Sequence, residues 1–573
     1  MKPSADINAL DAHEIRLRPT SYVMRLARMG AFHQTRLSFM RLLTRRMAKE
    51  AWTFARTVWD IDANGVGHAC YTVDTGARKY TLVAFAHDLP DHLRSDRVIA
   101  EAWDATFTLH DGVPTTTDIA RLSENVPNQE AGRISERELC LARANRSTRA
   151  WKMVINALAR GDCPGVEDLA DVGYLMRTTA VYGSGKFGAA DHATYAMRPE
   201  FSAPFQAEML TVYLIRTFVR DLANHMARQI GGESACALPG DVARSLGIGN
   251  STGLGMAPFL INHPKLLHNW VAARETALAR VRAVSKAEEE EKATFRKLLA
   301  AYQVDAMGWQ STHPRQSARC ADLRNDLATI AQWVDAGALD ISHPWDNLLR
   351  RAEIDLTVEA QEALVSLMLE PYPALCDPLA DSLTDTSEGY TQLDGTKTVD
   401  ETRSALRDIY GDLLDLDFDD PRESARAWYV SEEKMEPRLG ERFEEPIADY
   451  EQPLDTARAA QALERALARW PGSAPVAEVV VGTPELRSAL RRLQLAVECP
   501  YAEIRENTLA QDLMPIDMLR AKLSFFGATR FDPRSDRWVR INMFRGAPYP
   551  EELNQDNADF WVYPTPDVVG SLS

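Results

Sequence analysis

The sequence predicts a mainly α, overall α+β fold: a helical core, a small antiparallel sheet near the amino terminus, and a carboxyl-terminal α+β element with a β-hairpin. Between residues 167 and 370, apolar side chains recur at helical spacing. Residues 68–85 alternate like two strands around the turn Asp74-Thr-Gly-Ala77. Residues 522–531 and 538–544 alternate in the same way. Both alternations indicate antiparallel strand pairs.

The composition is that of a folded, acidic protein with several domains. Of 573 residues, 45% are hydrophobic and 26% are charged, and the net charge is −17. This length predicts roughly two to four domains, which we expect at residues 1–160, 161–370, 371–474 and 475–573. The acidity argues against nucleic acid as a partner. Seven cysteines without a CxxC pair, and no apolar run of about 18 residues, favour a cytoplasmic protein without a membrane span.

Residues 1–160 are expected to combine a basic helix with the small sheet. Residues 19–59 have helical periodicity, and no acidic residue lies between Glu14 and Glu50. The basic side chains suit an acidic partner or a membrane surface, or they dock on this protein's own acidic segment. Asp60-Ile-Asp-Ala-Asn-Gly65 opens like a calcium loop, but Tyr71 stands where such a loop needs Glu, so a turn before the hairpin explains it better. A strand is expected at 97–110 and a helix at 134–160.

Residues 161–370 are expected to form the helical core, and the rest of the chain differs in composition. Helices are predicted at 167–181, 205–230, 239–246, 264–292 and across 293–370. Residues 371–474 begin with prolines and are rich in acidic residues, so they predict an acidic linker with a short helix at 400–414. In the last segment, Thr483-Pro-Glu-Leu predicts the start of a helix. The hairpin that follows carries mostly cationic polar positions.

A glycine-rich loop at residues 182–188, with the sequence YGSGKFG, is the first candidate site. It is not a Walker A loop, because the required glycine and hydroxyl residues are replaced. Its backbone amides and one cation suit a carboxylate or phosphate, and Tyr182 is the proton donor that Lys186 would assist. The alternative is a glycine-rich connection that lets two helices approach each other closely. The candidates here are Tyr182, Lys186 and His192 for catalysis and Gly183, Ser184, Gly185, Arg177 and Arg198 for binding.

A second glycine-rich loop spans residues 247–258, GIGNSTGLGMAP. It lacks a complete GxGxxG, so a dinucleotide site is disfavoured, and a structural turn is the alternative to ligand contact. The candidate ligand-binding residues are Asn250, Ser251, Thr252 and Gly253. His263 follows as a candidate general base; its spacing to His268 does not suit a helical zinc pair. No metal site is predicted.

Cys499 is the third candidate. Pro500 suits the first position of a helix, which places Cys499 at the N-cap, where a helix N-terminus favours a nucleophilic thiolate. The alternative is a buried small residue before a helix.

The leading functional hypothesis is a cytoplasmic enzyme that binds a small anionic metabolite between the two glycine-rich loops. Its residues suit acid/base chemistry, such as elimination, hydrolysis or group transfer. The first alternative is a noncatalytic, self-assembling scaffold, which the segregated basic and acidic segments favour. The second is a flavin- or nucleotide-dependent enzyme with a nonstandard phosphate loop. The sequence identifies no cofactor, and we expect a homo-oligomer.

Overall fold

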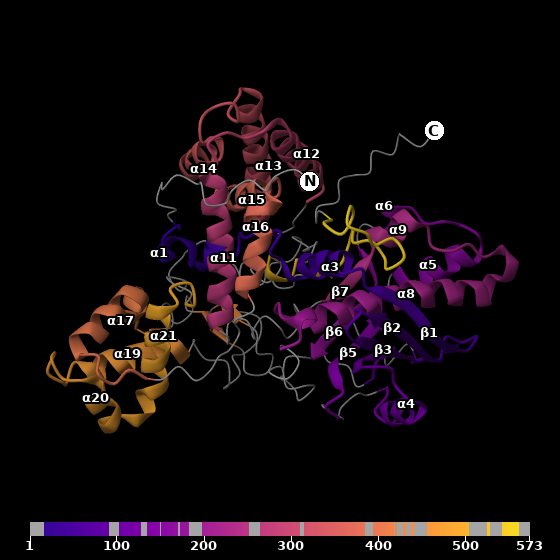
Figure 1. The fold of residues 1–573 in the computed structure, drawn as a ribbon, viewed down its shortest axis with the longest axis horizontal. Coiled ribbons are helices and arrows are strands. Elements are labelled where there is room, and N and C mark those ends of the chain that lie inside the picture. The colour runs from indigo at the N-terminus through magenta and orange to yellow at the C-terminus, as the bar shows by residue number, and fades with distance from the viewer. Residues whose placement is uncertain are drawn as a thin grey trace. The chain divides into compact units, whose positions relative to one another are not determined.

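The chain forms two compact units, one made of Met1–Thr35 with Ala257–Ala521 and the other of Arg36–Met256 with Lys522–Ser573. We call them the helical unit and the sheet unit and treat each by itself (Figure 1). The computed structural model describes residues 17–90, 102–127, 135–148, 150–169, 172–182, 197–250, 264–309, 314–383, 393–417, 419–420, 428–430, 437–439, 455–503, 524–527 and 541–560.

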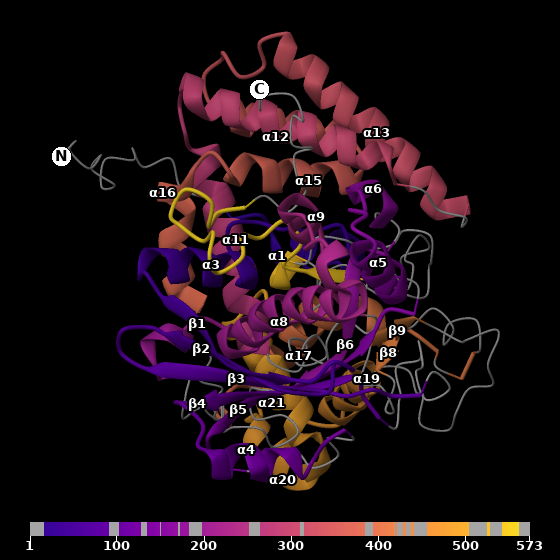
Figure 2. The same ribbon diagram turned by 90° about the vertical axis from the view of Figure 1, so that its right-hand side faces the viewer.

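The sheet unit is built on one eight-stranded mixed sheet, which is strongly curled like half a barrel (Figure 2). The strand order is β1-β2-β3-β4-β5-β6-β7-β10. The predicted fold class is therefore wrong: the sheet is neither small nor purely antiparallel. The strands are β1 Thr53–Ile61, β2 Gly67–Asp74, β3 Lys79–Ala86, β4 Ala105–Asp111, β5 Glu138–Arg146, β6 Tyr174–Tyr182, β7 Gly247–Asn250 and β10 Ile541–Met543.

The first six strands pair antiparallel in chain order, whereas β6 and β7 run parallel. β10 then pairs antiparallel with β7 at the edge of the sheet. A hairpin was predicted near the carboxyl terminus. In the described part of that segment, β10 instead pairs with β7, which lies far earlier in the sequence. The predicted β2–β3 hairpin is confirmed, with Asp74 opposite Lys79.

Helix α8 (Gln206–Gly231) lies across one face of this sheet (Figure 2). Its Phe218 ring contacts the rings of Phe107 in β4 and Tyr71 in β2, at centroid distances of 5.5 and 6.4 Å. Each fully buried aromatic or aliphatic side chain of this kind stabilises a fold by about 1.5–3 kcal/mol. The long helix predicted at 205–230 is confirmed. The other helices of this unit are α3 Phe39–Lys49, α4 Thr116–Ser123, α5 Ala150–Ala159, α6 Val166–Leu169 and α9 Gly240–Ser245, with the short 3-10 turns η4 Pro199–Phe201 and η5 Gly232–Ser234.

Much of the basic N-terminal segment is neutralised within the protein. In the sheet unit, Arg36, Arg41 and Arg45 all donate to Asp559, with distances of 2.6 Å from Arg41 and 3.0 Å from Arg45. Burial opposes ionisation of that carboxyl, but the three guanidiniums outweigh it and hold the pKa of Asp559 well below its usual range. These arginines therefore pair within the protein, but with Asp559 and not with the acidic segment at 371–474 that was expected to bind them.

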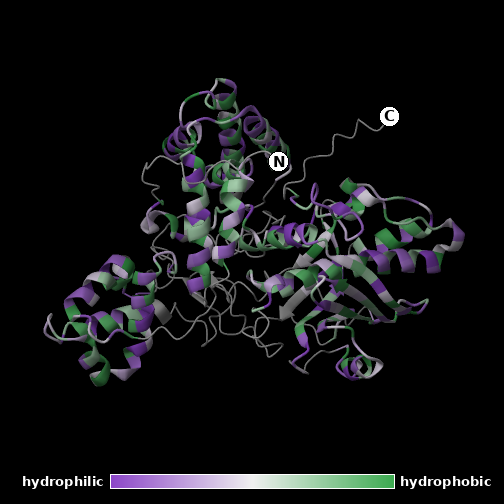
Figure 3. Cartoon of the chain, in the orientation of Figure 1, coloured by the Kyte–Doolittle hydropathy of each residue, from purple (hydrophilic) through white to green (hydrophobic). Residues whose placement is uncertain are grey.

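The helical unit contains α1 and α2 and the helices from α11 to α21. They carry alternating hydrophobic and hydrophilic bands, as amphipathic helices do (Figure 3). Arg18, Arg28 and Arg274 bind the buried Glu362, and Arg18 also binds Glu275 at 2.7 Å. The elements are α1 Thr20–Val23, α2 Leu26–Met29, α11 Pro264–Arg282, α12 Glu289–Met307, α13 Pro314–Asp335, α14 Pro344–Asp355, α15 Val358–Leu369, α16 Pro373–Cys376, η6 Asp377–Leu383, α17 Val399–Leu414, β8 Trp428–Val430, β9 Pro437–Leu439, α19 Asp455–Leu467, α20 Val476–Gly482, η7 Pro484–Leu486 and α21 Arg487–Glu498.

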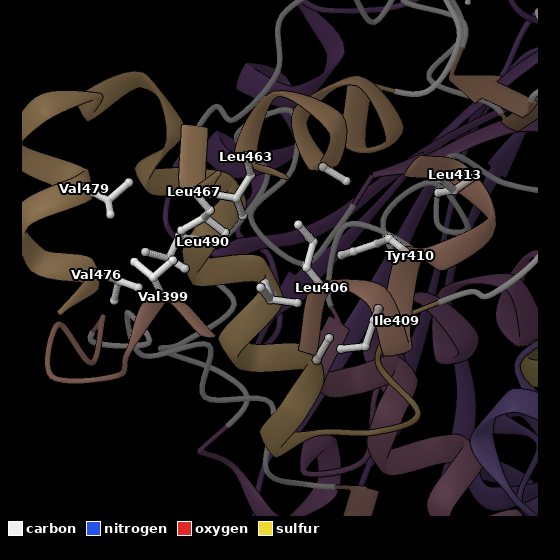
Figure 4. Packing of buried hydrophobic residues seen from close by; sticks show 13 residues of the cluster. Val399, Leu406, Ile409, Tyr410, Leu413, Leu463, Leu467, Val476, Val479 and Leu490 are labelled. Atoms are coloured by element: carbon white, nitrogen blue, oxygen red, sulfur yellow. The ribbon is translucent and has the colours of Figure 1, made fainter. Parts of the chain in front are cut away.

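Helices α17, α19, α20 and α21 enclose a small core of their own (Figure 4). Leu406 of α17, Leu463 of α19 and Leu490 of α21 meet in it, and each is at most 1% exposed. Helix α17 confirms the helix predicted at 400–414. Its N-terminus is closed by a capping box between Thr398 and Glu401.

Three segments predicted as helix contain strands instead. Residues 53–59 belong to β1, 138–146 form β5, and 174–181 lie in β6. The predicted helix at 19–59 is broken into α1, α2 and α3 before β1 begins. β5 and β6 gain their hydrogen bonds from partners distant in sequence, which local periodicity does not report, whereas β1 pairs with the following strand β2. Among the helices that the structure describes, none combines the length and apolar composition needed to cross a bilayer.

Candidate functional site

The two strands that lead into the glycine-rich segments are neighbours in the sheet. β6 ends at Tyr182 and β7 ends at Asn250, and the two strands are parallel neighbours, with Arg177 opposite Gly249. Parallel strands point their carboxyl ends to the same edge of a sheet. Ligands of open sheets with parallel strands bind at this edge, outside the strand ends. The sequence did not indicate this adjacency, because it placed each loop beside a helix.

Most of the predicted site residues follow these strand ends. Tyr182 and Asn250 are the last residues of β6 and β7. The structure describes their backbones but not their side chains. Gly183, Ser184, Gly185, Lys186, His192, Ser251, Thr252, Gly253 and His263 also lie outside the described residues. Their proposed roles therefore stay predictions.

Gly247 and Gly249, at the start of the predicted second loop, belong to strand β7 and have a packing role. A Cβ atom on Gly249 would lie 2.5 Å from the ring of Tyr174, and one on Gly247 would lie 2.5 Å from the carbonyl oxygen of Met543. Glycine lets the Tyr174 ring lie on β7 and lets β10 approach it closely. These two glycines shape the sheet next to the candidate site.

Five polar side chains share the face of the sheet opposite α8. One cross-strand row runs through β5, β6, β7 and β10 in the order Asn145, Arg177, Gly249 and Asn542. Each of these residues stands opposite the next one. Arg143 precedes Asn145 by two residues, and Thr106 of β4 stands opposite Arg143. We call these five residues the polar patch.

The orientation of the polar patch follows from strand alternation. Phe107 contacts α8, so its neighbour Thr106 points to the other face. Side chains directly opposite one another in paired strands share a face. All five residues of the polar patch therefore lie, like Thr106, on the face of the sheet that α8 does not cover.

Four of the five residues of the polar patch are buried, and Arg143 is partly exposed. Thr106, Asn145, Arg177 and Asn542 are each at most 5% exposed. Asn145 Oδ1 accepts from the backbone amide of Asp104 at 3.0 Å, which fixes the amide orientation. Asn145 Nδ2 and Thr106 Oγ1 are then buried without a partner in the part of the chain that the structure describes. An unsatisfied buried donor of this kind costs about 1–3 kcal/mol.

The positive charge of the polar patch comes from two arginines on adjacent strands. Arg143 lies over the ring of Trp103, with 4.7 Å from its Cζ to the ring centroid. Arg177 stands opposite Asn145, which follows Arg143 by two residues in β5. Guanidinium groups are the side chains best suited to bind carboxylate and phosphate oxygens in pairs.

His87 and Asp104 support the polar patch from its β4–β5 side. The amide of His87 donates to the carbonyl of Asp104 at 2.8 Å, and the Asp104 carboxylate accepts from the amide of Arg146 at 2.9 Å. Burial lowers the pKa of His87 to about 4, with the Arg146 charge in the same direction and Asp104 opposing it. His87 is therefore neutral at physiological pH. Asp104 in turn holds the Asn145 amide that faces the polar patch.

Arg198 and Cys499 lie elsewhere. Arg198 donates to Asp111 at 2.7 Å and to the Tyr80 hydroxyl at 3.3 Å, on the face of the sheet that α8 covers. Cys499 belongs to the helical unit, where it is the C-cap of α21 and not the N-cap of a following helix. The helix N-terminus on which its proposed reactivity depended is thus absent there.

Sequence reasoning missed Thr106, Arg143, Asn145 and Asn542 as site residues. Arg143, Arg146 and Arg149 recur at a helical spacing, which conceals the strand alternation of Arg143 with Asn145. Asn542 was placed in a hairpin, whereas it pairs with β7. In the described residues, no group of three or more His, Cys, Asp or Glu side chains is arranged to hold a metal ion.

Comparisons with protein families, with curated proteins and with solved structures found no match to this chain. The functional assignment therefore depends on the geometry and chemistry of the polar patch.

Proposed function

We propose that this protein binds a small anionic metabolite, through a phosphate or carboxylate group, over the polar patch, whose cross-strand row crosses β6 at Arg177 and β7 at Gly249. The observation that carries the proposal is the pair of unpartnered buried groups, Thr106 Oγ1 and Asn145 Nδ2, beside two arginines on one face of the sheet. A bound anion would accept hydrogen bonds from both groups.

The charge of the ligand follows from the side chains. Guanidinium groups pair favourably with carboxylate and phosphate oxygens, often through two parallel hydrogen bonds. Arg143 and Arg177 lie on the neighbouring strands β5 and β6. Thr106 stands opposite Arg143, and Asn145 stands opposite Arg177. A phosphate offers enough oxygen atoms to accept from both arginines, the amide and the hydroxyl at once.

We further propose that the protein is an enzyme that uses acid/base chemistry on this ligand. Tyr182 is the last residue of β6, the strand that carries Arg177, and Lys186 and His192 follow it in the sequence. Elimination, hydrolysis and group transfer each need a positioned proton donor or acceptor beside a bound anion. Cytoplasmic location and a homo-oligomeric state remain predictions.

The test compares ligand-induced thermal shifts of the wild-type protein and three variants. A panel of phosphorylated metabolites, carboxylates and nucleotides is screened, because a ligand that binds the folded state raises the melting temperature. We expect a ligand whose effect is lost in Arg177→Gln. The effect should persist in Arg198→Gln, since Arg198 pairs with Asp111 on the other face of the sheet.

Thr106→Val is the third variant and does not depend on removing a charge. Its hydroxyl has no partner in the described structure, so the isosteric valine should leave the unliganded protein as stable as wild type or more so. The same change should weaken ligand binding, because the ligand would lose one hydrogen bond. A ligand that shifts wild type, Arg177→Gln and Thr106→Val equally would place its site elsewhere, and the absence of any anionic ligand would contradict the binding function.

A further inference from the structure

Two cysteines of the sheet unit lie in contact. The Sγ atoms of Cys163 and Cys236 are 3.2 Å apart, although the residues are 73 positions apart in sequence. Cys163 is exposed and Cys236 is half-buried. A disulfide needs a sulfur–sulfur distance of about 2.05 Å, so a small side-chain movement would join them.

The backbone holds the two cysteines side by side. The amide of Cys236 donates to the carbonyl of Leu158 at 2.9 Å, and the amide of Gly161 donates to the same carbonyl at 3.0 Å. Both segments are thus hydrogen-bonded to the last turn of α5. They also pack closely, since a Cβ atom on Gly161 would lie 2.8 Å from the carbonyl oxygen of Ser234.

We infer that Cys163 and Cys236 form a reversible disulfide when the protein meets a peroxide. The two sulfur–hydrogen bonds break and one sulfur–sulfur bond forms. The thiols lose two electrons and two protons, and hydrogen peroxide takes them up and becomes two water molecules. A dithiol reductant reverses the step by thiol–disulfide exchange.

The position of the pair gives the disulfide a consequence for the fold. Cys163 precedes β6 and Cys236 precedes β7, so the bond would join the two segments that lead into the parallel strands. It would close a loop that contains β6 and α8. Crosslinks across long loops stabilise mainly by restricting the unfolded chain. The oxidised protein should therefore unfold at a higher temperature than the reduced protein.

The test is thiol mapping of the full chain before and after treatment with hydrogen peroxide. The reaction is quenched with acid, the unfolded protein is alkylated, and each cysteine peptide is identified by mass spectrometry. We expect loss of alkylation at Cys163 and Cys236 together, one linked peptide pair, a monomer on a non-reducing gel and full recovery with dithiothreitol. Melting temperature should rise on oxidation of the wild-type protein.

Single variants provide the controls. Cys163→Ser and Cys236→Ser should each abolish both the linked peptide and the rise in melting temperature, while Cys499→Ser should keep both. The inference is overturned if both thiols remain fully alkylated after peroxide, if the linkage joins two chains, or if a different pair of cysteines is linked. Protection of the thiols by added zinc with no oxidation would likewise count against it.

Discussion

Replacing Gly249 with alanine tests how closely β6 and β7 pack beside the candidate site. The new Cβ atom would lie 2.5 Å from the Tyr174 ring, whereas carbon atoms in contact are about 3.5–4.0 Å apart. The ring must therefore move, and overpacking of this kind costs about 1–3 kcal/mol. Alanine also reduces the entropy of the unfolded chain, which returns about 0.4–1 kcal/mol. We expect a net loss of about 1–2 kcal/mol in the free energy of unfolding.

The assay is unfolding in urea, monitored by tryptophan fluorescence. Gly240→Ala is the matched control, because nothing lies within 4 Å of its Cβ position, and it should be neutral or slightly stabilising. The double variant Tyr174→Ala with Gly249→Ala should cost less than the sum of the single variants, with a coupling of about 1 kcal/mol or more. If Gly249→Ala is as stable as Gly240→Ala, the Tyr174 ring does not lie on β7 and the described β6–β7 packing is wrong.

Two further predictions concern the supports of the site. Arg216, buried in α8, donates to the carbonyls of Leu246 and Ala547 at 2.9 Å each. Arg216→Met should lower the free energy of unfolding by about 2–4 kcal/mol, because these carbonyls lose their donor. An equal loss in the exposed control Arg228→Met would refute this reasoning. The folded-state pKa of His87, about 4, lies below its unfolded value of about 6.5, so protonation favours unfolding and stability is lost as pH falls from about 6.5 toward 4. His87→Gln should accordingly lose about 2 kcal/mol less than wild type between pH 7 and pH 4, and an NMR titration of His87 with a midpoint near 6.5 would contradict the sign.

The elements that the sequence predicted well are those whose signal is local. The apolar stripe of α8 and its glycine stop, the β2–β3 turn at Asp74-Thr-Gly, and the capped start of α17 all depend on residues close together in the chain. The structure contains each of them. Helices and tight hairpins satisfy their backbone hydrogen bonds within such short stretches.

The strands that were missed depend on remote partners. β7 is four residues long and contains Gly247 and Gly249, so it resembles a loop until β6 and β10 lie on either side of it. β5 was hidden because Arg143 and Arg146 are three residues apart, a helical spacing, whereas the polar patch uses Arg143 and Asn145. A cross-strand row appears only once the register of four strands is known.

The candidate site was predicted in part for the same reason. The two glycine-rich loops were identified from local composition, and Arg177 was selected with them. The parallel pairing of β6 and β7, which lead into these segments, is not encoded by either segment alone. The unpartnered atoms of Thr106 and Asn145 are properties of the folded sheet alone.

The measurement that tests the central claim most directly is a crystal structure of the protein soaked with tungstate, a heavy analogue of phosphate. Its anomalous signal locates the anion independently of any assay of activity. We predict a peak within hydrogen-bond distance of Arg177 and Asn145 Nδ2, and its loss in crystals of the Arg177→Gln variant. A polar patch without tungstate, in crystals that bind it elsewhere, would contradict the proposed site.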